Sequence, residues 1–142
     1  MPLLTIGYAG RELEGFLETL AQADVTDLVD VRYTAISHKK GFSKTALGNA
    51  VSNAGMRYHH LRSVGVPKDL WKQLQTAEGF AAFGQRYLKV LDDRTTELAE
   101  IVALARAGRC CLLCVEPEVA RCHRGLLAQR LEVELGTETK HL

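Results

Sequence analysis

Short apolar segments alternate with longer amphipathic segments along this chain, and that alternation restricts its fold more than any other feature. The predicted strands span residues 3–6, 27–31, 56–61 and 110–115. Residues 3–6 and 110–115 are short apolar runs typical of buried strands, whereas residues 56–61 alternate and are rich in strand-favouring residues. Parallel strands must be joined by long crossover connections, which are usually helices. We therefore predict a single three-layer α/β domain over residues 1–142, with a mostly parallel sheet of four to five strands and helices on both faces.

Apolar side chains recur at helical spacing in the segments between the predicted strands. Ser43 is expected to cap the second helix at its start, and Gly55 is expected to end it. Residues 138–142 are the candidate fifth strand. The helices themselves are expected over residues 11–23, 44–53, 80–91, 98–105 and 124–135.

The composition is that of an ordinary soluble globular protein, with 46% hydrophobic and 25% charged residues. No apolar run approaches the roughly 20 residues that a membrane-spanning helix needs. The first residues have neither the basic leader nor the long apolar stretch of a signal peptide. We therefore expect a cytoplasmic protein without a membrane partner, whose four cysteines do not form structural disulfides. The sequence requires no cofactor and indicates no particular oligomeric state.

The net charge of +1 conceals a basic segment over residues 31–72, which has eight Lys or Arg side chains against one acidic side chain. The same segment includes His38, His59 and His60. A patch of this kind favours an anionic partner, either a small molecule or a nucleic acid. The alternative is a solvated basic face with no partner.

Polar residues follow the predicted strands at the edge of the sheet where open parallel α/β proteins bind their ligands. Tyr8 follows the first strand, Arg32 follows the second, and His59 lies near the end of the third. Together with Lys44 of the basic segment, these residues are our candidates for binding an anionic substrate. The densest group of reactive side chains, residues 114–124, follows the fourth strand.

That last segment contains two thiols, an imidazole, a carboxylate and a guanidinium. Cys122 is expected at the start of the last helix, where free N–H groups and the helix dipole stabilise a thiolate, and it is our leading nucleophile. Cys114 is a second catalytic candidate, although buried cysteines often only pack. Glu116 and His123 are the candidates for moving protons. Arg124 is expected to bind an anion together with the helix N-terminus.

Metal binding is an alternative use of the same residues. Cys114, Cys122 and His123, with one further histidine, would supply four zinc ligands, although seven residues separate the two cysteines. The Cys111-Leu-Leu-Cys114 string is not a redox motif, because strand residues three apart point to opposite faces of the sheet. The chain has no phosphatase loop, Walker loop or dinucleotide-binding fingerprint.

Several segments, in this order, resemble the family called domain of unknown function 488 (DUF488). The most specific of them is a cysteine and a glutamate followed by Cys-His-Arg. The chain departs from the common family pattern at Tyr8, where many members have histidine, and at His38 and Lys40. The resembling segments are Thr5-Ile-Gly-Tyr-Ala-Gly10, Val29-Asp-Val-Arg32, Gly41-Phe-Ser-Lys44, Tyr58-His-His-Leu61, Gly65-Val-Pro-Lys68, and Leu112-Leu-Cys-Val-Glu116 with Cys122-His-Arg124.

The resemblance implies an α/β sandwich with a shared pocket, and it implies no activity. The Val-Asp-Val-Arg strand end is also similar to that of rhodanese domains, but the rhodanese cysteine loop is missing, so sulfur transfer is a minor option. The family positions carried over are Cys114, Glu116, Cys122, His123, Arg124 and Arg32.

The residues support three functional hypotheses. The first is a cysteine-dependent enzyme that acts on a phosphate-bearing substrate, a nucleotide or nucleic acid, with Cys122 as the thiolate and with Arg32 and Arg124 on the phosphate. The second is a non-catalytic nucleic-acid-binding module that uses residues 31–72. The third is a metal-binding protein that uses the two cysteines and the histidine named above.

Overall fold

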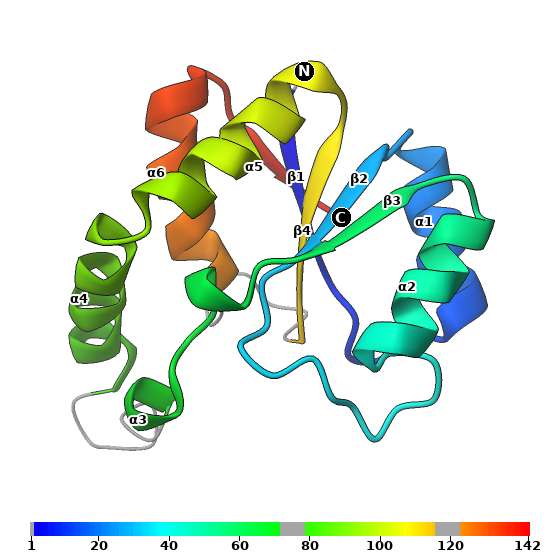
Figure 1. Cartoon of the computed structure of the whole chain (residues 1–142), viewed down its shortest axis with the longest axis horizontal. Helices are drawn as coiled ribbons and strands as arrows, with labels where there is room; N and C mark the ends of the chain where they lie inside the picture. Colours follow the sequence, from blue (N-terminus) through cyan, green and yellow to red (C-terminus); the bar gives the residue numbers. More distant parts are fainter. Residues whose placement is uncertain (1, 72–78, 116–122) are drawn as a thin grey trace.

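The computed structural model describes residues 2–71, 79–115 and 123–142 of the chain, and it contains one five-stranded sheet (Figure 1). The strand order is β3-β2-β4-β1-β5, and every pairing is parallel. The predicted parallel α/β fold is therefore confirmed, including the short fifth strand. The strands are β1 (Leu3–Gly7), β2 (Asp27–Asp30), β3 (Arg57–His60), β4 (Cys110–Cys114) and β5 (Thr139–His141).

The helices follow the periodicity of the sequence to within a few residues at each end. The last helix begins at His123, one residue before the expected start, so this imidazole belongs to its first turn. The helices are α1 (Leu13–Gln22), α2 (Lys44–Asn53), α3 (Lys68–Trp71), α4 (Gly79–Asp92), α5 (Thr95–Ala107) and α6 (His123–Leu135), and a 3-10 turn, η1, spans Arg62–Val64. Across these elements, none is both long enough and apolar enough to cross a lipid bilayer.

Two hydrophobic clusters, on opposite faces of the sheet, attach the helices to it. Figure 1 shows α1 and α2 on one side of the sheet, and α4, α5 and α6 on the other. The first cluster includes Ile6, Leu28, Leu113, Phe16, Leu20, Leu47 and Val51. The second cluster includes Val29, Leu112, Phe83, Tyr87, Ile101 and Leu127. Because neighbouring strand residues point to opposite faces, the central strands β1, β2 and β4 each contribute to both clusters.

The cysteines of β4 show the same alternation. Cys111 lies in the cluster beneath α1 and α2, whereas Cys110 and Cys114 lie in the cluster beneath α4, α5 and α6. The expectation that Cys111 and Cys114 point to opposite faces is therefore confirmed.

Ser43 precedes α2 as expected, but its hydroxyl makes no capping hydrogen bond to the helix. The hydroxyl instead accepts a hydrogen bond from the Ser37 N–H at 3.0 Å and donates one to the Ser37 carbonyl oxygen at 3.2 Å. Serine hydroxyls bond readily to nearby backbone groups, and the loop before α2 offers these groups first. Ser43 is therefore the N-cap residue of α2, as predicted, but its hydroxyl bonds within the loop between β2 and α2 and not to the helix.

β4 differs from its two neighbouring strands in the face of the sheet on which its following helix packs. β4 lies between β2 and β1, whose following helices, α2 and α1, pack on one face. The helix that follows β4, α6, packs on the other face. A change of face between adjacent strands opens a crevice beyond their carboxyl ends, and ligands commonly bind in such crevices.

Candidate functional site

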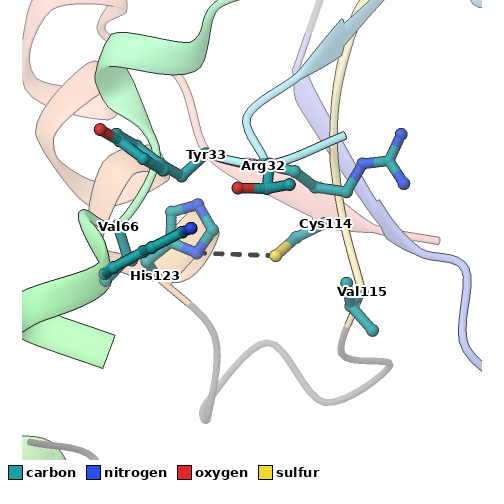
Figure 2. A pocket seen from close by; sticks show the side chains of 8 residues that line it. Arg32, Tyr33, Val66, Cys114, Val115 and His123 are labelled. Atoms are coloured by element: carbon teal, nitrogen blue, oxygen red, sulfur yellow. Dashed lines mark hydrogen bonds between the residues drawn. The ribbon is translucent and has the colours of Figure 1, made fainter. Parts of the chain in front are cut away.

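A cavity of about 360 Å³ lies at the carboxyl end of β4. Figure 2 shows Cys114, from the last position of β4, facing His123, from the first position of α6. Both side chains are nearly buried, at 3% and 4% exposure, so the cavity is their main contact with solvent. The cavity is lined by Arg32, Tyr33, Thr34, Val66, Lys68, Cys114, Val115 and His123.

The Cys114 Sγ atom lies 3.5 Å from the His123 Nδ1 atom. On the other side of the ring, His123 Nε2 lies 2.8 Å from the carbonyl oxygen of Val31. A carbonyl oxygen only accepts hydrogen bonds, so Nε2 must carry the proton in the neutral ring and Nδ1 must be the acceptor. The arrangement therefore gives the Cys114 thiol a base in the correct tautomer.

The secondary structure around the pair explains its position. Cys114 ends β4 and His123 begins α6, so the last residue of a strand and the first residue of a helix, nine positions apart, lie within hydrogen-bonding distance. The amino-terminal end of a helix carries partial positive charge, which favours a thiolate beside it. The rings of His123 and Tyr87 also pack in a T-shaped arrangement at a centroid distance of 5.4 Å, which restricts rotation of the imidazole.

The Val31 carbonyl is held in place by the neighbouring backbone. The Val31 N–H donates a hydrogen bond to the Leu113 carbonyl oxygen of β4 at 3.1 Å. Gly65 also packs against this backbone, so closely that a Cβ atom there would lie 2.4 Å from Tyr33 N and 2.9 Å from Val31 O. Only glycine fits at this contact without displacing the carbonyl that orients His123.

Arg32 and Asp30 form a buried ion pair directly after this carbonyl. Arg32 donates from Nε to Asp30 Oδ1 at 2.8 Å, from Nη2 to Asp30 Oδ2 at 2.6 Å, and from Nη1 to the Phe42 carbonyl oxygen at 2.7 Å. Burial lowers the pKa of Arg32, but the hydrogen bond and charge of Asp30 outweigh it and raise the pKa overall. The guanidinium extends away from the Cys114–His123 pair in Figure 2. The guanidinium of Arg32 therefore bonds to the Asp30 carboxylate and the Phe42 carbonyl oxygen within the protein.

Three other predicted anion-binding residues lie away from the cavity lining. The Tyr8 ring stacks on Phe42 at 4.7 Å, and its hydroxyl donates to Ser37 Oγ. His59 Nε2 lies 2.9 Å from Asp27 Oδ1, on the first residue of β2. Lys44 is exposed at the start of α2.

The remaining candidates come from β4 and the segment that follows it. Arg124 is buried in α6, at 1% exposure. Glu116 and Cys122 lie outside the described residues. Within residues 2–71, 79–115 and 123–142, no three His, Cys, Asp or Glu side chains gather as a metal-binding group.

Several residues of the cavity wall were not predicted from the sequence, namely Tyr33, Thr34, Val66, Lys68 and Val115. The Gly65-Val-Pro-Lys68 segment was a usable signal, because a Gly and a Pro around a polar turn mark a constrained loop. The Val31 carbonyl was not predictable, since every residue has a backbone oxygen. Only the fold determines which of these oxygens meets His123.

Comparison with known proteins places the chain in a family. The family model described as domain of unknown function DUF488 matches residues 12–131. The chain belongs to the DUF488 family. This match covers Cys114, His123 and the segments that support them, so the cavity lies within the DUF488 domain. No curated protein and no solved structure matched this DUF488 chain significantly.

Proposed function

We propose that this DUF488 protein is a cysteine-dependent enzyme in which Cys114 is the nucleophile and His123 is the base. The supporting observation is the ordered contact from Cys114 Sγ to His123 Nδ1 and from His123 Nε2 to the Val31 carbonyl. A thiol, a base beside it and a third group that orients the base are the parts that activated cysteine nucleophiles share. The phosphate-bearing substrate predicted from the sequence remains the proposed substrate class.

The reaction begins with transfer of the Cys114 thiol proton to His123 Nδ1. The thiolate attacks an electrophilic atom of the substrate, forming a bond to sulfur, while the leaving group departs and takes the proton from the imidazolium. The ring keeps its Nε2–H bond to the Val31 oxygen throughout, so both protonation states of His123 are accommodated. A nucleophile such as water then releases the product from sulfur.

Cys122 was the leading nucleophile from sequence, and the experiment that tests the proposal separates the two thiols. Iodoacetamide is added at pH 7, and the labelled peptides are quantified over time by mass spectrometry. Cys114 is expected to react at least tenfold faster than a free thiol, because its thiolate is stabilised. If Cys122 reacts first, the nucleophile is Cys122. If neither exceeds a free thiol, the protein is not a thiol enzyme.

Two further thiols are internal controls in the same sample. Burial raises the pKa of Cys110 to about 12, and burial also raises the pKa of Cys111 well above its usual value. Both should stay unlabelled in the folded protein and become labelled after denaturation.

A metal site at the same pair is the second candidate. Tetrahedral zinc with one cysteine and one histidine ligand holds S and N about 3.6 Å apart, close to the 3.5 Å between Cys114 and His123. Histidine ligands also commonly donate their other N–H to a backbone carbonyl, as His123 does to Val31. Elemental analysis of protein purified without an affinity tag tests this candidate, and a stoichiometric metal would replace the thiol mechanism.

The exposed cations of residues 31–72 support a third candidate, nucleic-acid binding without catalysis. Lys40, Lys44 and Arg62 are exposed and make no ion pair with any described residue. Binding of this type weakens steeply with salt because counterions are released. Titration of a labelled oligonucleotide at 50 and 200 mM salt tests it, and absence of binding at the lower salt concentration rules it out.

A further inference from the structure

We infer that Lys68 forms an anion-binding site at the edge of the Cys114 cavity, and that the ligand is a small molecule with one carboxylate or phosphate group. This inference deepens the proposed function, because it concerns the substrate of the same cavity. Arg32 and Lys44, the anion-binding candidates of the basic segment, are replaced in this role by Lys68.

The first support is that two arginines of the basic segment are paired with carboxylates, whereas Lys68 has no such partner among the described residues. The Arg32 guanidinium is paired with Asp30, and the Arg57 guanidinium with Asp27 at 2.7 Å. Lys68 lines the cavity, is exposed, and makes no hydrogen bond or ion pair with any described residue. Among the described residues, none occupies any of the three donors of its ammonium group.

The second support is a neighbouring positive charge. The Arg62 guanidinium lies over the Tyr33 ring at 4.2 Å from the ring centroid, and Tyr33 lines the cavity. Arg62 and Lys68 both come from the segment that leads from η1 into α3. A second cation in contact with a residue of the cavity wall adds to the positive potential around Lys68, which raises the local concentration of anions.

The third support is the size and character of the cavity. Its volume of about 360 Å³ lies near the lower end of the roughly 300–1,000 Å³ of small-molecule sites. Val66, Val115 and the Tyr33 ring provide apolar wall, while Cys114 and His123 provide the reactive groups. The cavity thus suits a small ligand whose charged group meets Lys68 and whose apolar part lies near the thiol.

Anion titration by NMR tests the site without relying on thiol chemistry. Phosphate and acetate are each added to the wild-type protein, to Lys68→Met and to Lys89→Met, whose substitution removes an exposed lysine of α4. Saturable shifts at Lys68 and Tyr33 are expected in the wild type and in Lys89→Met, and are expected to be lost in Lys68→Met. The anion that saturates at lower concentration identifies the favoured group. Absence of saturable shifts with both anions would overturn the inference.

Alkylation of Cys114 tests the effect of the Lys68 charge at the thiol. The ratio of Cys114 labelling rates with anionic iodoacetate and neutral iodoacetamide cancels the thiolate fraction, which both reagents share. Lys68→Met is expected to lower this ratio about two- to fivefold, the size of an interaction between partly exposed charges, whereas Lys89→Met leaves it unchanged. An equal ratio in all three proteins counts against the anion site. Unreactive Cys114 with saturable anion binding refutes only the thiol mechanism.

Discussion

The Nε2 atom of His123 lies 2.8 Å from the carbonyl oxygen of Val31, 92 positions earlier in the chain. This contact joins the start of α6 to the residue after β2, and it determines which ring nitrogen faces Cys114. Val31 in turn is bonded to β4 through the Leu113 carbonyl oxygen. The orientation of the His123 ring therefore depends on the edge of the sheet. Substitutions that move this edge should change the reactivity of the Cys114 thiol.

Replacing His123 by Gln removes the base but keeps an amide that can donate to Val31. At pH 7, alkylation of Cys114 is expected to slow at least tenfold, since an isolated thiol is mostly protonated there. The pH of half-maximal alkylation should rise to at least about 8.5, the value for an ordinary cysteine, because the buried thiol would have no base beside it. Rates measured between pH 5 and pH 10 check this, and an unchanged profile would show that His123 is not the base.

Replacing Gly65 by Ala should disturb both stability and reactivity. The new Cβ would lie 2.4 Å from Tyr33 N and 2.9 Å from Val31 O, so the backbone must move. We expect a loss of about 1–3 kcal/mol in the free energy of unfolding, as for other overpacked sites, and slower alkylation of Cys114. Gly15→Ala is the control: Gly15 lies in α1 with no atom within 4 Å of a built Cβ, and there the change should stabilise the helix by about 0.5–1 kcal/mol. Urea unfolding measures both.

Replacing Arg32 by Met should act on folding. Asp30 is fully buried and would lose its main partner. Removing one member of a buried pair costs about 3–5 kcal/mol of unfolding free energy. Lys44→Met, at an exposed position without an ion pair among the described residues, should stay within about 0.5 kcal/mol of the wild type. Equal stabilities in the two variants would return Arg32 to the list of substrate-binding residues.

Asp27 should make the free energy of unfolding depend on pH in the acidic range. Its hydrogen bonds with Arg57, His59 and Thr26 outweigh burial and hold the pKa of Asp27 well below its usual value. A depressed folded-state pKa stabilises the protein above the unfolded value of about 3.9, and this stabilisation is lost as the pH falls toward the folded-state pKa. Asp27→Asn should therefore be less stable than the wild type at pH 6, with a difference that shrinks below about pH 4. Urea unfolding at pH 3 to 7 measures it, and a constant difference would contradict the assignment.

The elements of the fold were predictable because their signals are local. The apolar runs of β1 and β4 and the apolar stripes of α1 and α6 each lie within a short stretch of sequence. These patterns match the burial of the strands and helices in the two clusters. Cys114 and His123 were recognisable as site candidates for a similar reason, since they flank the junction between the last apolar strand and the last helix.

The partners of each polar side chain were decided only by the tertiary structure. Arg32 and His59 occupy strand-end positions that suit a ligand, yet each forms a pair with a buried carboxylate, Asp30 and Asp27 respectively. Such pairings depend on strand register and on which face a side chain takes, and these depend on residues far away in the chain. The sequence by itself determined where strands and helices form and which segment carries the reactive groups. The packing of the sheet edge decided that Cys114 meets His123, because that contact needs a backbone oxygen whose position no residue type encodes.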